Sequence, residues 1–199
     1  LDDLMSMISL LGSMQILAKG TYGYSPLHIS VKNGHFECVK YLLSLTEYTQ
    51  FVGLKDNLDN NPMHLAVAYG RIDILVLMVE KFGKKILLNK GCGDYTALDL
   101  AAQVGNVACV KYLLSHYDYK RFSTMTDDNQ YKPVHFAAAS GNVNILKCLV
   151  EKVGNEILLE ICNRRTPLHF ALKNGQEACV SYLMVQKIIL DNLHRIDIF

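Results

Sequence analysis

The stretch Thr166-Pro167-Leu168-His169 decides the fold, because four other segments repeat its pattern at a near-constant interval. The related segments are Ser25-Pro26-Leu27-His28, Asn61-Pro62-Met63-His64, Thr96-Ala97-Leu98-Asp99 and Lys132-Pro133-Val134-His135. Their second residues lie 36, 35, 36 and 34 residues apart, and a glycine follows each by eight residues (Gly34, Gly70, Gly105, Gly141 and Gly175). A period of this length is typical of a repeat architecture in which each unit is one supersecondary element.

Each motif marks the start of a short helix. Serine, asparagine and threonine at the first position cap the first turn with a side-chain oxygen, and the following proline suits the first helical position because its missing N–H has no partner there. The glycine suits the left-handed residue that ends a helix. Lys132 has no capping hydroxyl, so the fourth unit is expected to have a weaker helix start.

A second helix is expected after each glycine. Apolar residues recur there at helical spacing, as in Leu75, Met78 and Val79. Two of the connectors that follow are longer, 81–88 and 152–159, and are interpreted as lengthened second helices or as helix-plus-turn insertions. Because neither helix is long enough to be stable alone, each pair must bury its apolar face against neighbouring pairs.

The period and the T-P-L-H pattern resemble the ankyrin repeat. The resemblance implies an all-α repeat solenoid built from helix-turn-helix units with a β-hairpin finger. It implies five ankyrin repeats in 21–199, at about 21–56, 57–91, 92–127, 128–161 and 162–199, and a partial repeat in 1–20 that supplies a second helix and its connector. Because neither end resembles the polar cap of natural arrays, we interpret the chain as a segment of a longer array.

One finger position usually carries glycine in this family. Here it holds Gly23, Asp59, Asp94, Gln130 and Arg164. Aspartate tolerates the left-handed conformation moderately well, whereas glutamine and arginine tolerate it poorly. Distorted fingers are therefore expected at Gln130 and Arg164.

Composition excludes several classes of function. Half of the residues are apolar and a fifth are charged, which excludes a disordered scaffold. The net charge is +1, without the clustered basic charge that sequence-independent nucleic-acid binding requires. No apolar run approaches the roughly 20 residues of a transmembrane helix, and the six cysteines do not form the pattern of a disulfide framework. We expect a cytoplasmic protein, or the cytosolic part of a membrane protein.

The periodic histidines could suggest a metal site. His28, His64, His135 and His169 are one repeat apart, but packed helices lie about 8–10 Å apart and Zn–N bonds measure about 2 Å, so two of them cannot readily share an ion. Each imidazole is instead expected to bridge backbone groups of adjacent fingers, and Asp99 to accept similar hydrogen bonds. No metal or cofactor is predicted.

The cysteines fall into two groups. Cys38, Cys109 and Cys179 share a position in the second-helix stripe and are interpreted as small buried apolar residues. Cys92 and Cys162 fall in fingers, where a reactive thiol near Lys90 or Arg164 stays open. Gly91-Cys92-Gly93 lacks the strand and helix that a dinucleotide loop requires, and a turn explains it.

The resemblance implies protein partners that bind at the fingertips and at the exposed ends of the first helices. Carried over residue by residue, these positions include Tyr22, Tyr24, Lys32, Asn57, Tyr69, Tyr95, Gln103, Asp128, Asn129, Tyr131, Arg165 and Lys173. Tyrosine and arginine are enriched at binding hot spots. The alternative for each tyrosine is that its ring packs on the next finger and only its hydroxyl is exposed. Tyr41, Tyr112 and Tyr182 repeat within the second helix and are expected to pack.

No catalytic motif is present in the sequence, so the predicted function is a non-catalytic protein-interaction scaffold that uses a concave groove. The alternative is a structural or regulatory cytosolic segment of a larger protein, such as an ion channel or a multidomain enzyme.

Overall fold

The computed structural model describes residues 18–118 and 131–192. The chain divides into two compact units, Leu1–Cys92 and Gly93–Phe199. Each unit is a stack of helix pairs, and the described part of the chain contains no β-strand. None of the helices in the described ranges is both long and apolar enough to cross a membrane. The expected partial repeat in 1–20 lies almost entirely outside the described residues.

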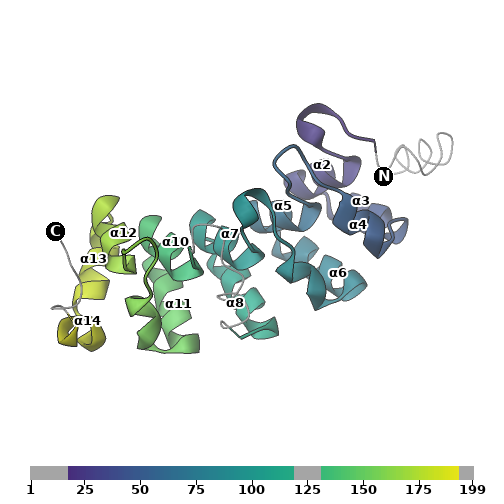
Figure 1. Ribbon diagram of the computed structural model, residues 1–199. Helices are drawn as coiled ribbons and strands as arrows, with labels where there is room; N and C mark the ends of the chain where they lie inside the picture. The colour runs from purple at the N-terminus through teal and green to yellow at the C-terminus, as the bar shows by residue number, and fades with distance from the viewer. Residues whose placement is uncertain (1–17, 119–130, 193–199) are drawn as a thin grey trace. The chain divides into compact units, whose positions relative to one another are not determined.

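The described residues of the first unit form two helix pairs, whose helices are labelled in Figure 1. α2 (Pro26–Asn33) and α3 (Phe36–Ser44) form the first pair, and α5 (Pro62–Ala68) and α6 (Ile72–Phe82) form the second. α2 packs on α5, and α3 packs on α6. The shorter elements are η2 (Thr21–Gly23), α4 (Tyr48–Gly53) and η3 (Lys84–Leu88).

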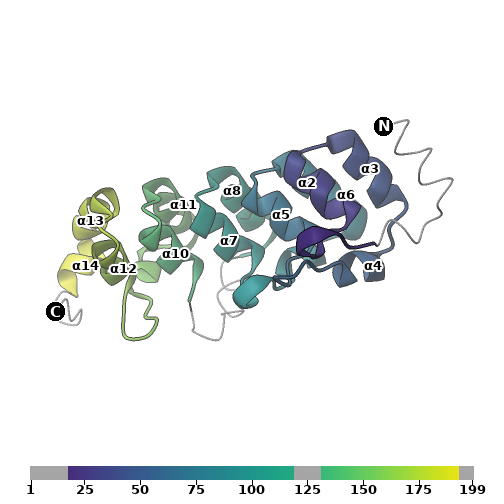
Figure 2. The same cartoon turned by 90° about the horizontal axis from the view of Figure 1, so that it is seen from above.

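The second unit stacks three helix pairs. The pairs are α7 (Ala97–Val104) with α8 (Val107–His116), α10 (Pro133–Ala139) with α11 (Val143–Val153), and α12 (Pro167–Lys173) with α13 (Glu177–Met184). The first helices form one row and the second helices another, as both views show (Figures 1 and 2). Within the row, α10 packs on α7 and on α12. The remaining elements are η4 (Cys92–Asp94), η5 (Asn155–Leu159) and α14 (Lys187–Asp191).

The predicted helix starts and ends are confirmed. Ser25 Oγ accepts a hydrogen bond from the His28 backbone N–H at 3.4 Å, and Asn61 Oδ1 accepts one from the Met63 N–H at 3.0 Å. The glycines eight residues after the motif position are left-handed, as at Gly34 with φ 75°. Lys132 gives no side-chain cap, yet α10 still begins at Pro133, because proline at this position is pre-organised for a helix.

The two long connectors are helix-plus-turn insertions. α6 ends at Phe82, Gly83 breaks it with a positive φ of 79°, and the 3₁₀ helix η3 follows. α11 and η5 repeat the arrangement around Gly154. The insertions add core, because Ile86 and Leu87 in η3 and Ile157 and Leu158 in η5 are all buried.

The described fingers are tight turns and do not form extended β-ladders. In three of them two consecutive residues have positive φ: Tyr22 and Gly23, Gly93 and Asp94, and Asn163 and Arg164. The expectation of a distorted finger at Arg164 is wrong. Cys162 and Arg165 exchange both backbone hydrogen bonds, at 2.9 and 2.8 Å, because positive φ at both central residues matches the twist of a two-residue hairpin. Gln130 lies outside the described residues.

The cysteines of the second helices differ in burial. Cys109 and Cys179 are fully buried, as expected, and burial raises the pKa of both thiols to about 11. Cys38 is only half-buried, so its assignment to the core is wrong. Tyr41, Tyr112 and Tyr182 are half-buried, as packing residues with an exposed hydroxyl would be.

Candidate functional site

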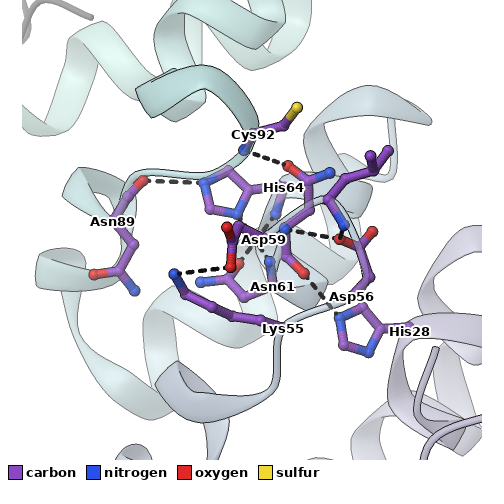
Figure 3. A network of polar contacts seen from close by, with 10 residues as sticks. His28, Lys55, Asp56, Asp59, Asn61, His64, Asn89 and Cys92 are labelled. Atoms are coloured by element: carbon purple, nitrogen blue, oxygen red, sulfur yellow. Dashed lines mark hydrogen bonds and ion pairs between the residues drawn. The ribbon is translucent and has the colours of Figure 1, made fainter. Parts of the chain in front are cut away.

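Buried histidines connect the first helices α2 and α5 to the connectors that follow. His64 Nδ1 accepts the Asn61 backbone N–H at 3.1 Å, and its Nε2 lies 3.0 Å from the Asn89 carbonyl oxygen (Figure 3). His28 pairs with the Ser25 N–H and the Asn60 carbonyl in the same way. Because Nδ1 accepts in each case, the proton lies on Nε2 and is donated to the carbonyl. The predicted bridging role of these histidines is confirmed.

The same arrangement recurs in the second unit. His135 Nδ1 accepts the Lys132 N–H at 3.2 Å, and Nε2 lies 3.0 Å from the Glu160 carbonyl oxygen. Burial lowers the pKa of His28 below its usual value and lowers the pKa values of His64 and His135 to about 4. These imidazoles are therefore neutral near pH 7 and act as structural braces. Asp99 takes the position in the third repeat and accepts the Thr96 N–H at 3.0 Å.

A buried carboxylate shapes the finger between α4 and α5. Asp56 Oδ1 accepts the backbone N–H groups of Leu58 and Asn60, each at 2.8 Å (Figure 3). This holds Asn60 so that its carbonyl meets His28 and its Oδ1 accepts the Cys92 N–H at 3.1 Å. Gly91 is required beside it, because a Cβ there would come within 2.6 Å of Asn60 Oδ1. These hydrogen bonds hold the finger in a fixed conformation.

The first unit carries a cluster of tyrosines around one lysine, which we call the Lys32 cluster (Tyr22, Tyr24, Lys32 and Tyr69). Lys32 Nζ lies 5.3 Å from the centre of the Tyr24 ring and 5.6 Å from that of Tyr69. Tyr24 also stacks on His28, with ring centres 5.8 Å apart. Both distances from Nζ are within the range of a cation–π interaction, so the lysine covers the faces of two aromatic rings.

The second unit carries a pocket of about 560 Å³ over the row of first helices, which we call the aromatic pocket. Its aromatic lining comes from two finger tyrosines and two phenylalanines of α10 and α12. The ring of Phe136 lies 4.9 Å from that of Tyr95 and 5.4 Å from that of Tyr131, and Tyr131 lies 5.4 Å from Phe170. The remaining lining residues are Gln103, His135, Ala139, Ser140, Lys173 and Asn174.

The rim of the aromatic pocket is polar, and some of its side chains already form hydrogen bonds within the protein. Ser140 Oγ donates to the Phe136 carbonyl at 2.8 Å and lies 3.2 Å from the Ala102 carbonyl oxygen, which links α10 to α7. Asn174 Nδ2 donates to the Phe170 carbonyl at 2.8 Å. Gln103 and Lys173 are exposed. The pocket therefore combines a rigid aromatic floor with two long polar side chains at its edge.

Comparison with known proteins decides the family. A family model described as "Ankyrin repeats (3 copies)" matches residues 4–90, 52–123 and 120–192. The chain belongs to the ankyrin-repeat family. Ankyrin repeats are generally protein-interaction modules and are generally non-catalytic.

Several relatives are much longer than this ankyrin chain. It is 31% identical over 137 residues to "Putative E3 ubiquitin-protein ligase XBAT31" of Arabidopsis thaliana, a match to 64% of this chain and 29% of that protein. It is 31% identical over 170 residues to "Transient receptor potential cation channel subfamily A member 1" of Homo sapiens (81% and 14%). The match to "Nuclear factor NF-kappa-B p105 subunit" of Gallus gallus is 24% identical over 167 residues (82% and 17%). The chain thus spans less than a third of each.

The ankyrin fold brings some of the predicted surface residues together and separates others. Tyr95, Gln103, Tyr131 and Lys173 line the aromatic pocket, and Tyr22, Tyr24, Lys32 and Tyr69 form the Lys32 cluster. Asn57 lies beside that cluster, where its backbone N–H donates to the Tyr22 carbonyl at 3.0 Å. Arg165 is exposed in the last finger and does not line the pocket. Asp128 and Asn129 lie outside the described residues.

The two phenylalanines of the pocket were not predicted from the sequence. Phe136 and Phe170 directly follow the motif histidine in successive repeats, and this recurrence is the signal that could have found them. The tyrosine rings of Tyr95 and Tyr131 pack on Phe136 and line the pocket as well. They therefore combine the two roles that the sequence left open as alternatives.

The finger thiols differ in accessibility. Cys162 is fully buried, whereas Cys92 is exposed. Burial removes Cys162 from consideration as a reactive thiol, because such thiols are at least partly accessible. The described residues contain no group of three or more histidine, cysteine or acidic side chains that could hold a metal ion.

Proposed function

We propose that the chain is a non-catalytic protein-recognition module and that the aromatic pocket is its main recognition surface. The observation that carries the proposal is the pocket itself, about 560 Å³ in volume, with an aromatic floor and a polar rim. Pockets of this size that combine aromatic side chains with a few polar groups are typical of binding sites. Aromatic residues also dominate the energetic centres of protein interfaces.

Rigidity supports the same function. The pocket lies on packed first helices, its tyrosines pack on the phenylalanine rings of α10 and α12, and His135 braces the connector that follows. A surface already held in its binding shape loses little conformational entropy when a partner binds. The other predicted positions, including the Lys32 cluster, Asn57, Asp128, Asn129 and Arg165, are proposed as secondary contacts.

The test is affinity capture with three forms of the chain. Ala139→Gln places a longer neutral side chain in the aromatic pocket, and Ala108→Gln makes the same change at an exposed position of α8. We expect proteins retained by the wild type and by Ala108→Gln to be lost from Ala139→Gln, as quantified by mass spectrometry. An identical set of proteins on all three forms would contradict the proposal. Circular dichroism checks that each form is folded.

A second candidate function is a regulatory or structural segment of a larger protein. The relatives favour it, since one is named as a cation channel and another as a ubiquitin ligase, and the chain matches 14% and 29% of their lengths. The complete gene product decides: membrane spans or a catalytic domain beside the array would support this candidate, and an array without other domains would exclude it.

We also propose that the protein is located in the cytoplasm. All six cysteines lie within the described residues, and none of them forms a disulfide, as is usual in a reducing compartment. Imaging of a fluorescent fusion of the complete protein tests the location, and accumulation in the secretory pathway would contradict it.

A further inference from the structure

The described lining of the aromatic pocket carries charge of one sign. Among the described lining residues, Lys173 is charged, and none is acidic. His135 is fully buried and neutral near pH 7, because burial lowers its pKa to about 4. The described part of the pocket therefore presents a single positive charge at the edge of an uncharged surface.

The floor of the pocket suits a large apolar side chain. Phe136 and Phe170 are nearly buried, with 8% and 5% of their surface exposed, and they present ring atoms between Tyr95 and Tyr131. Aromatic rings pair well with a further ring in edge-on or offset geometry. A pocket of about 560 Å³ has room for one such side chain and its adjoining backbone.

The rim leaves Lys173 available for a partner. Within the described ranges, Lys173 has no ion pair, hydrogen bond or ring contact. The corresponding lysine of the first repeat differs, because Lys32 already lies over two tyrosine rings. Lys132, in the same unit, is paired with Glu160 at 3.1 Å. Among the described lining residues, Lys173 is thus the cation that a ligand in the pocket would meet.

We propose that the aromatic pocket binds an extended segment of a partner protein in which a large aromatic or aliphatic side chain lies within a few residues of a carboxylate. The apolar side chain enters over Phe136 and Phe170, and the carboxylate pairs with Lys173. This inference rests on the proposed function and specifies the chemistry of the partner. A basic segment would bring a like charge to Lys173, and none of the described lining residues is acidic to balance it.

The first part of the test selects ligands without assuming a sequence. Phage carrying random dodecapeptides are selected on the complete 199-residue chain and then sorted by binding to Ala139→Gln and Ala108→Gln. We expect peptides that bind the wild type and Ala108→Gln but not Ala139→Gln. Their shared pattern should hold an aromatic or large aliphatic residue with aspartate or glutamate within three positions.

The second part measures the charge pair. A synthetic peptide of the selected pattern is expected to bind Lys173→Gln about two- to fivefold more weakly than the wild type, the effect of one partly exposed ion pair. The same peptide with its acids changed to amides should bind both forms equally. Lys111→Gln, at an exposed position of α8, is the matched control and should leave the affinity unchanged.

The outcomes separate this inference from the proposed function. Pocket-dependent peptides that are basic or uncharged, or an affinity unchanged in Lys173→Gln, would overturn the acidic partner and leave the recognition function standing. Selected peptides that bind Ala139→Gln as well as the wild type would overturn both. If Ala139→Gln fails to fold, the exposed Lys173→Gln variant still decides the charge pair.

Discussion

The Lys32 cluster and the aromatic pocket use equivalent repeat positions in different ways. Lys32 and Lys173 each lie six residues after the motif proline, and Tyr24 and Tyr131 each lie two residues before it. In the first unit the lysine lies over the rings of Tyr24 and Tyr69. In the second unit the neighbouring rings border a pocket, and Lys173 stands at its rim.

The difference comes from the residues around each lysine. The position after the motif histidine holds Ile29 in the first repeat and Phe136 and Phe170 in the fourth and fifth. The residue that follows the position equivalent to Lys32 is Tyr69 in the second repeat and Ser140 in the fourth. Ser140 is hydrogen-bonded to backbone carbonyls. The serine places no further aromatic ring at that point of the second unit. The same scaffold thus carries a lysine over aromatic rings in one place and a lysine at the rim of a pocket in another.

Acidification should affect the braces of both units alike. Stability contributed by His64 and His135 is complete above about pH 6.5 and is lost as the pH falls toward 4, because the unfolded chain binds protons that the folded chain does not. At pH 5 we expect a loss of about 2 kcal/mol for each of the two histidines. Urea unfolding at pH 7 and pH 5, followed by hydrogen exchange in each unit, measures it.

The pH experiment tests whether the histidine braces of the two units respond alike. If only one unit lost protection at pH 5, the two units would differ in their internal braces and not just in their surfaces. His35 is exposed in the link between α2 and α3, so His35→Gln is the control and should leave the acid transition unchanged.

The fingers offer a second contrast. The second of two left-handed residues is Gly23 in the first finger and Arg164 in the last. The left-handed conformation costs an L-residue about 1 kcal/mol relative to glycine. We therefore expect Arg164→Gly to raise the free energy of unfolding by about 0.5–1 kcal/mol, measured by urea denaturation.

Arg165→Gly is the matched control for this finger. Arg165 is not left-handed, so glycine there removes no strain and should be neutral or destabilising. Equal stabilisation by both changes would show that the backbone of Arg164 is not the cause.

Two lysine variants test the surfaces themselves. Lys32→Ala should lower stability by about 0.5–1 kcal/mol, since it removes a cation from two ring faces. Lys173→Ala should change stability by less than about 0.5 kcal/mol, the usual range for an exposed side chain without a partner. Equal losses at the two positions, measured by thermal unfolding, would remove the distinction between a lysine that lies over aromatic rings and a lysine that stands at the rim of the pocket.

The sequence predicts the repeat scaffold well because that information is local. The caps at Ser25 and Asn61, the left-handed Gly34 and the bridging His64 all follow from the residue types and their spacing. For the connector around Gly83 the sequence leaves two alternatives, a lengthened second helix and a helix-plus-turn insertion. The backbone conformation of the structure distinguishes them.

The surface was harder to predict because it depends on side chains from three repeats. Whether Lys32 lies over Tyr24 or extends into solvent is a rotamer choice that spacing does not settle. The pocket depends on Phe136 and Phe170 facing tyrosines of adjacent fingers. Asp56 likewise has no repeat signal, although its carboxylate organises a finger.

Titration with N-acetylphenylalanine, which carries one aromatic ring and one carboxylate, tests the aromatic pocket most directly. In heteronuclear NMR spectra of the labelled chain, we predict shifts of the amides of Ala139, Lys173 and Asn174. Lys32 and Asn33 should not shift, and the uncharged N-acetylphenylalanine amide should bind more weakly. Shifts centred on the Lys32 cluster or on the second helices, with the amides of α10 and α12 unmoved, would contradict the account.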